Sequence, residues 1–185
     1  MTGAPKDLTA ARLRELLLYD PDTGIFTWVK RSARGSHIRA GHMTGGIDKS
    51  HGYRTIGIDG RTYLAHRLAW LWMTGKWPVA DVDHRDLDRA NTRWRNLREA
   101  TRSQNNTNVH KRANNTSGFK GVRWNTFKSG RGKWGMRIAV GGKKFHLGYF
   151  NCLAMATIVA DVAAVLAHGE YARVDASIRE AMAET

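Results

Sequence analysis

Between Glu99 and Asp161 the chain has no acidic residue, and this stretch is long enough to form a small domain. Eight lysine and arginine residues lie between positions 113 and 150, with aromatic residues such as Trp124 and Trp134 interleaved among them. Aromatic side chains at such intervals are typical of a packed core, whereas a flexible basic tail lacks them. We therefore expect this stretch to fold compactly and to present a strongly positive surface.

The whole chain of 185 residues has a formal net charge of +14 and 42% hydrophobic residues, which suffice for one medium domain or two small ones. A polyanion is the first partner to expect, because lysine and arginine release counterions from a phosphate backbone. The single cysteine, Cys152, excludes an internal disulfide and a zinc site built on several thiolates. No apolar run approaches the ~20 residues of a membrane helix, and no signal-peptide pattern precedes the first helix, so we expect a cytoplasmic protein with no membrane partner.

Three strand-like runs follow one another in the basic stretch, at 119–125, 133–140 and 143–150. Gly141-Gly142 between the last two is typical of a two-residue hairpin turn. A helix is predicted over 152–167, with Asn151 as its N-cap and Gly169 at its end. The sequence therefore predicts a three-stranded antiparallel sheet packed on one helix.

Side chains alternate between the two faces of a strand, which predicts two unlike faces for this sheet. The apolar face, for the helix to cover, would carry Val122, Trp124, Trp134, Met136, Ile138, Val140, Phe145 and Leu147. The other face is cationic and rich in hydrogen-bonding groups, and would carry Arg123, Asn125, Gly135, Arg137, Ala139, Lys144 and His146. A ribbon of this kind can enter the major groove of B-DNA, where arginine reads guanine and asparagine reads adenine. The alternative is an ordinary solvent-exposed face.

Short motifs follow one another in this region: Gly118-Phe119-Lys120-Gly121-Val122-Arg123-Trp124, Gly132-Lys133-Trp134, Leu147-Gly148-Tyr149-Phe150 and His168-Gly169-Glu170-Tyr171. Their order resembles the plant Apetala-type (ethylene-response) DNA-binding domain, whose sheet lies in the major groove. The resemblance implies DNA contacts at Lys120, Arg123, Asn125, Arg137, Lys144 and His146. Asn125 and Ala139 replace family arginines and Arg137 replaces a family acid, so the plant target sequence does not carry over.

The predicted helix over 152–167 contains one charged residue, Asp161. A helix that is apolar all round is usually buried on more than one side. We expect its outer face to pack on the N-terminal part of the chain or on a second copy, which would make the protein a homodimer.

The region before this basic stretch contains side chains whose oxygens could bind a metal ion, and a histidine that could act as a general base. Val82-Asp83-His84 would form a short strand, Asn96-Leu97-Arg98 would return beside it, and Thr101 with Gln104 forms a capping box that predicts a helix with Asn105 in its first turn. Mg²⁺ prefers carboxylate, carbonyl and water oxygens, a role that Asp83 and Asn105 fit. His84 is the natural general base near neutral pH, and Asn96 would hold the loop that aims it. A surface histidine beside a turn acid is the alternative.

Further motifs surround these residues: Tyr63-Leu64-Ala65-His66-Arg67-Leu68-Ala69-Trp70 upstream, and Arg93-Trp94-Arg95-Asn96-Leu97-Arg98 downstream of Val82-Asp83-His84. The set resembles the HNH (ββα-metal) endonucleases, especially the homing type of phages and group I introns. The resemblance implies one Mg²⁺ or Mn²⁺ ion per active site held by Asp83 and Asn105, with His84 as base supported by Asn96. Leu87 stands where the family often has glycine, and Asn91-Thr92 where it often has Asp-Asn.

These observations predict an α+β protein in which a ββα-metal nuclease core is followed by the sheet-and-helix domain. The expected segments are a nuclease domain at 1–110, a linker at 111–117, a DNA-binding domain at 118–174 and a tail at 175–185. We expect a metal-dependent endonuclease acting on double-stranded DNA, encoded by a phage and working in a bacterial cytoplasm. A non-cleaving DNA-binding regulator with a degenerate nuclease fold is the main alternative, and an RNA-binding protein is a weaker one.

Overall fold

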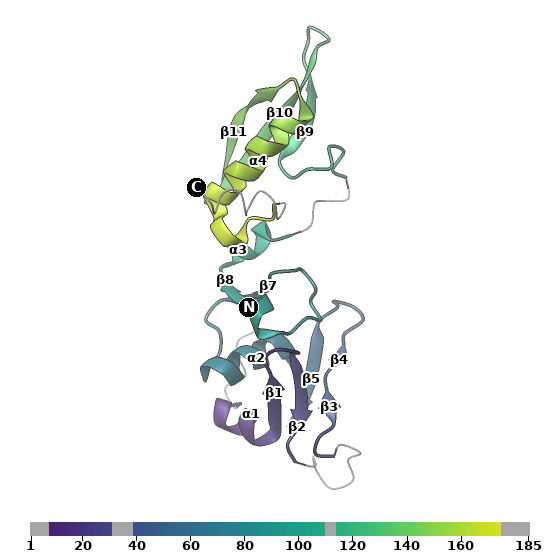
Figure 1. The fold of residues 1–185 in the computed structure, drawn as a ribbon, viewed down its shortest axis with the longest axis vertical. Coiled ribbons are helices and arrows are strands. Elements are labelled where there is room, and N and C mark those ends of the chain that lie inside the picture. Colours follow the sequence, from purple (N-terminus) through teal and green to yellow (C-terminus); the bar gives the residue numbers. More distant parts are fainter. Residues whose placement is uncertain (1–7, 31–38, 110–113, 175–185) are drawn as a thin grey trace. The chain divides into compact units, whose positions relative to one another are not determined.

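The computed structural model describes residues 8–30, 39–109 and 114–174 of the chain (Figure 1). The chain divides into two compact units, residues 1–101 and 102–185, and each is treated by itself below. Both combine short helices with small antiparallel sheets, which confirms the α+β class. The predicted domain borders remain predictions; the predicted tail at 175–185 and the first residues of the predicted linker lie outside the described residues.

The described residues of the first unit form three helical segments and three small sheets. The strand orders of the sheets are β1-β2-β3, β4-β5-β6 and β7-β8. The elements are α1 (Ala10–Leu16), β1 (Leu17–Asp20), β2 (Ile25–Trp28), β3 (Met43–Thr44), β4 (Gly46–Ile47), β5 (Arg54–Ile58), β6 (Arg61–Leu64), α2 (Ala65–Thr74), β7 (Asp81–His84), the 3₁₀ helix η1 (Trp94–Asn96) and β8 (Leu97–Ala100).

Local sequence signals explain where these elements begin and end. The Thr9 side chain accepts a hydrogen bond from the Arg12 amide and so caps α1. Asp59 and Gly60 both have positive φ, which is what the tight turn between β5 and β6 requires. Gly75 ends α2 in the left-handed conformation.

One apolar core holds the first unit together. It contains side chains from α1, β1, β2, β5, α2 and β7, and its fully buried members include Leu13, Tyr19, Phe26, Ile56 and Leu68. Trp70 and Trp72 pack against this core. The core therefore fixes α2 and β7, the two elements that carry the histidines discussed below.

The second unit contains the predicted three-stranded antiparallel sheet, in the order β11-β10-β9 (Figure 1). Its elements are α3 (Arg102–Thr107), β9 (Val122–Thr126), β10 (Gly132–Val140), β11 (Lys143–Phe150), α4 (Leu153–His168) and the 3₁₀ helix η2 (Gly169–Tyr171). Helix α4 lies along one face of the sheet, and Ala156 and Ala160 pack there against Val122 and Met136.

A β-bulge changes the faces of β11 from those predicted. Arg137 pairs with His146, but Met136 pairs with Gly148, so Leu147 has no partner in the register. After this irregularity Tyr149 joins the face away from α4, and Phe150 packs towards α4. The prediction that Phe145 and Leu147 are core residues was wrong, since 46% and 39% of their surfaces are exposed. The extra residue breaks the two-residue alternation at Leu147. Phe145 stays opposite Ile138 on the predicted face but is not fully covered there.

The outer side of α4 is apolar and exposed, with Met155, Ile158 and Leu166 each more than half accessible. Segment Leu153–Tyr171 is long and apolar enough to cross a membrane by length and composition alone, a test that a core helix of a soluble protein also passes. The sequence prediction that no run approaches this length therefore overlooked α4 together with η2. That the N-terminal part of the chain or a second copy covers this face stays a prediction.

Candidate active site

The β7–β8 hairpin places two of the predicted site residues side by side. Asp83 and His84 end β7, and their partners on β8 are Arg98 and Leu97. Both site residues are buried, each with 4% of its surface accessible. A charged residue at such a position needs a partner, because burial without one costs several kcal/mol.

Arg98 forms an ion pair with Asp83. Its Nε and one terminal nitrogen donate to the same carboxylate oxygen, Oδ2, at 2.9 and 2.8 Å. Arg98 itself is 6% exposed, so this is a buried ion pair across the hairpin. Sequence reasoning missed this pair, although opposite charges facing one another across two short strands are a detectable signal once the register is known.

His84 packs in a cluster of rings. The ring of His66, from the first turn of α2, meets the His84 ring edge-on, with centroids 4.8 Å apart. The Tyr53 ring lies 5.2 Å from His66 and 6.0 Å from His84. Burial lowers the pKa of His84, and Arg89 lowers it further, while Asp86, Asp83 and Asp88 oppose the shift. A neutral imidazole results, which is the form that accepts a proton.

The pKa of His66 departs further from its ordinary value than the pKa of His84 does. Burial is the main reason that the pKa of His66 falls to about 3, and electrostatic interactions with Arg67 and with the His84 ring add to the effect. Within the described part of the chain its Nδ1 atom has no hydrogen-bond partner. This buried position beside His84 suits a structural role for His66.

This burial predicts a loss of stability in acid. The folded-state pKa of His66, about 3, is below the ordinary value of 6.5, so the unfolded chain binds more protons between these two pH values. The free energy of unfolding should therefore fall as the pH falls from 6.5 towards 3, and His84 should contribute in the same direction. His66→Phe should weaken this dependence. Urea titrations at pH 7 and pH 5 measure it, and an equal loss in both proteins would contradict the prediction.

Asn96 organises the loop between β7 and β8. Its side-chain nitrogen donates to Asp86 Oδ1 and to the Asn91 carbonyl, each at 2.9 Å, and its Oδ1 accepts from the Asp86 amide at 3.1 Å. Its backbone carbonyl accepts from the Arg85 amide. Asn96 was expected on the returning strand; it lies instead in η1, one residue before β8 begins. The side chain therefore ties together both ends of the loop that follows His84.

Leu87 occupies a backbone position that favours glycine. Its φ is +69°, and its amide donates to the His84 carbonyl at 3.0 Å, so the chain turns sharply there. A leucine in the left-handed region costs about 1–2 kcal/mol. Leu87→Gly should therefore raise the free energy of unfolding by up to about 1 kcal/mol, after the entropy of glycine is subtracted. Thermal unfolding of the wild type and of Leu87→Gly measures this difference. A lower stability of the glycine variant would contradict the claim that the backbone is strained at Leu87.

Thr92, the other departure from the family pattern, joins the loop to the N-terminal hairpin. It is buried, and its hydroxyl donates to the Gly24 carbonyl at 2.6 Å. The Thr92 carbonyl accepts from the Tyr19 hydroxyl at 2.7 Å. Burial raises the pKa of Tyr19 well above its ordinary range, so this hydroxyl remains a donor. Through these two hydrogen bonds the β1–β2 hairpin holds the loop between β7 and β8 in place.

The predicted metal ligands come from different units. Asp83 belongs to the first unit, whereas Asn105 lies on α3 in the second. Among the described residues, no group of three or more histidine, cysteine, aspartate or glutamate side chains could hold a metal ion. An Mg²⁺ ion needs only one or two protein ligands, and it prefers carboxylate, carbonyl and water oxygens. The oxygen chemistry of Asp83 and Asn105 thus suits Mg²⁺ or Mn²⁺.

The predicted DNA-binding residues of the second unit gather on one face of the sheet. Arg123, Arg137 and Tyr149 flank Gly135 on this face, and Asn125, Lys144 and His146 extend it. The bulge adds an aromatic group to the face, because Tyr149 contacts His146 and Phe127 with ring centroids 4.4 and 5.0 Å away. Gly135 leaves room for the Asn125 side chain, because a Cβ at position 135 would lie 2.4 Å from the side-chain amide nitrogen of Asn125.

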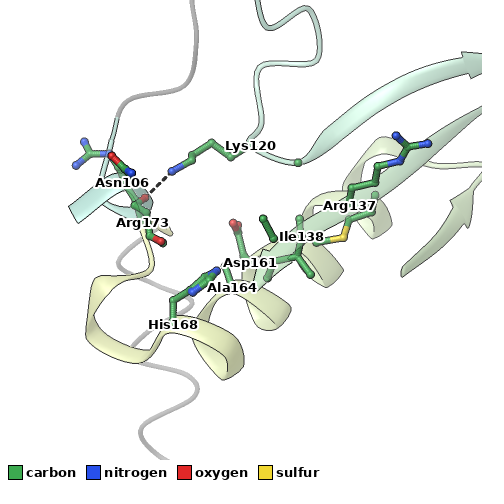
Figure 2. A pocket seen from close by; sticks show the side chains of 13 residues that line it. Asn106, Lys120, Arg137, Ile138, Asp161, Ala164, His168 and Arg173 are labelled. Carbon is green, nitrogen blue, oxygen red and sulfur yellow. Dashed lines mark hydrogen bonds between the residues drawn. The ribbon is translucent and has the colours of Figure 1, made fainter. Parts of the chain in front are cut away.

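Lys120 differs from the other predicted DNA contacts. It precedes β9, and its ammonium group donates to the backbone carbonyl of Thr107 at 2.7 Å (Figure 2). It also donates to the backbone carbonyl of Val109 at 3.1 Å. Burial lowers its pKa, and Arg173 adds to the shift. It lines a cavity of about 230 Å³ between the sheet and α4, together with Arg137, Asp161 and His168. In this structure Lys120 therefore ties the end of α3 to the sheet.

Residues 63–107 match the family model of the HNH endonucleases. The match spans β6, α2, the β7–β8 hairpin and α3, and so contains Asp83, His84, Asn96 and Asn105. It supports an HNH endonuclease domain in this part of the chain, hence a nuclease, a hydrolase acting on DNA. No curated protein and no solved structure matches the chain.

Proposed function

We propose that this protein is a metal-dependent DNA endonuclease whose general base is His84. The observation that carries the proposal is the position of His84: a buried, neutral imidazole at the end of β7, inside the segment that matches the HNH endonucleases. The loop behind it is fixed by Asn96, and the ring cluster of Tyr53 and His66 holds its plane.

In the proposed reaction His84 takes a proton from a water molecule, whose oxygen forms the new bond to phosphorus. The bond from phosphorus to the 3′ oxygen breaks, and that oxygen leaves with a proton from solvent. Asp83 and Asn105 would hold the Mg²⁺ or Mn²⁺ ion, which when bound polarises the phosphate and stabilises the leaving oxygen. Arg98 fixes the Asp83 carboxylate, and Asn96 keeps the loop from displacing His84.

The second unit would hold the DNA. Its sheet presents Arg123, Asn125, Arg137, Lys144 and His146 on one face, a composition suited to the major groove. Lys120 is the weakest of the proposed contacts, because its ammonium group is engaged by two carbonyls. The homing type, a phage origin and a bacterial cytoplasmic location are part of the same proposal. One such site cuts one strand, so a double-strand break would need a dimer or two encounters.

A second candidate function is a DNA-binding regulator that does not cut. The ion pair of Asp83 with Arg98 favours it, since a carboxylate neutralised by an arginine is a poorer metal ligand. The presence of His84 and Asn96 in ordered, buried positions favours the nuclease.

Incubation of supercoiled plasmid with Mg²⁺ or Mn²⁺, and with EDTA, separates the two functions. The nuclease produces nicked circles only with the metal, and linear product indicates paired action. Binding of duplex DNA with no cleavage of a genomic library in either metal would favour the regulator. Competition between duplex DNA and duplex RNA at matched salt tests the second unit, and tighter binding of RNA would contradict its proposed role.

A further inference from the structure

An arginine that has no role in the proposed reaction stands beside the ring cluster of the first unit. Arg89 lies in the loop after β7 and is exposed. Its guanidinium carbon is 4.9 Å from the centre of the Tyr53 ring, and one of its nitrogens donates to the His51 carbonyl at 2.9 Å. Two independent contacts from the segment before β5 therefore hold this side chain in one place.

The charge of Arg89 is not neutralised by the acids of its own loop. Asp86 accepts hydrogen bonds from Asn91, Asn96 and the Asp88 amide, and Asp88 accepts from the Ala90 amide. Within the described part of the chain, no carboxylate forms an ion pair with Arg89. A guanidinium has five N–H donors, so most of the donors of Arg89 face solvent.

Arg89 is also close to the proposed base. The Tyr53 ring contacts both groups, and the two distances place the guanidinium within about 11 Å of the His84 ring. The charge of Arg89 acts on His84, as noted above. A DNA strand whose scissile bond lies at His84 would bring its backbone phosphates into this space, and a fixed guanidinium matches a phosphate in charge and in bidentate geometry.

We propose that Arg89 is a substrate-binding residue that holds a backbone phosphate of the cut strand, at or next to the bond that is broken. This inference rests on the proposed nuclease function, because the position of the strand is set by His84. Tyr53 and the His51 carbonyl pre-orient the guanidinium, so that little side-chain entropy is lost when the phosphate binds.

Arg89→Gln removes the charge, and Arg61→Gln is the matched control. Arg61 is also exposed, but it pairs with Ile58 at the turn of the β5–β6 hairpin, whereas Tyr53 precedes the other end of β5. In plasmid nicking with Mg²⁺, Arg89→Gln should raise KM about tenfold and change kcat less than about threefold, the signature of lost ground-state binding. Arg89→Lys should fall between the wild type and Arg89→Gln, because it retains the charge without the planar fork.

Equilibrium binding to a short duplex, with no metal present, supplies a second readout that does not require cleavage. The slope of log K against log salt should decrease by about 0.9 for Arg89→Gln and stay unchanged for Arg61→Gln. If the wild type never nicks but the slope still changes in this way, the phosphate contact stands while the nuclease proposal fails. Equal KM values and equal slopes for the two glutamine variants would overturn the inference, as would a loss confined to kcat.

Discussion

Replacing Arg98 by methionine should lower the free energy of unfolding of the first unit by about 3–5 kcal/mol. The substitution leaves the Asp83 carboxylate buried at 4% exposure without the two hydrogen bonds that now satisfy it. Methionine retains much of the volume of arginine, so the loss reports the uncompensated charge rather than a cavity. Hydrogen exchange of the β7 and β8 amides measures it, because exchange resolves the first unit from the second.

The matched control is Arg95→Met, on the 3₁₀ helix just before β8. Arg95 is exposed, and its replacement should change stability by less than about 0.5 kcal/mol. In the double variant Asp83→Leu/Arg98→Met much of the stability should return, because a buried ion pair can often be replaced by apolar side chains at little cost. If Arg98→Met were as stable as Arg95→Met, the buried pair would not be present in solution.

Gly24→Ala should cost about 2–4 kcal/mol, the other large effect that we expect. Gly24 has a φ of +74°, and an added Cβ would lie 2.5 Å from the Arg93 amide nitrogen and 2.6 Å from the Thr92 carbonyl carbon. Both atoms are backbone and cannot move aside without displacing the loop that Asn96 organises. The variant should therefore lose nicking activity together with stability.

Gly60→Ala distinguishes the cost of backbone strain at positive φ from the cost of a steric clash of the added Cβ. Gly60 has a similar φ of +77°, but no atom lies within 4 Å of an added Cβ. Its replacement should cost only the backbone term, about 1–2 kcal/mol, and leave nicking intact. Thermal unfolding and plasmid nicking of both variants measure the difference. Equal effects would mean that the N-terminal hairpin does not support the loop at Thr92.

Local signals in the sequence predicted the elements that depend on local chemistry. The β7 strand, the Gly141-Gly142 hairpin and the helix over 152–167 all appear in the structure close to their predicted bounds. Positions that depend on contacts between distant segments were harder to predict. The bulge at Leu147 moved Tyr149 to the opposite face, and only pairing with β10 reveals it.

The candidate site shows the same division. The residue types and spacing identified Asp83, His84 and Asn96, and the structure brings these three to one hairpin and its loop. The partner of Asp83, the ring cluster around His84 and the position of Arg89 over Tyr53 depend on register and packing. Leu87 was noticed as a departure from a family pattern, and its positive φ gives that departure a physical meaning.

The central claim is that His84 is the base of a DNA-cleaving site, and its replacement by alanine tests this most directly. Wild-type protein and a folded His84→Ala variant would be compared on supercoiled plasmid with Mg²⁺ at equal concentration. We predict that the nicking rate of the variant is lower by about 10²–10⁴-fold, the range for loss of a general base, while duplex binding is unchanged. Metal-dependent nicking at the same rate by both proteins would contradict the account.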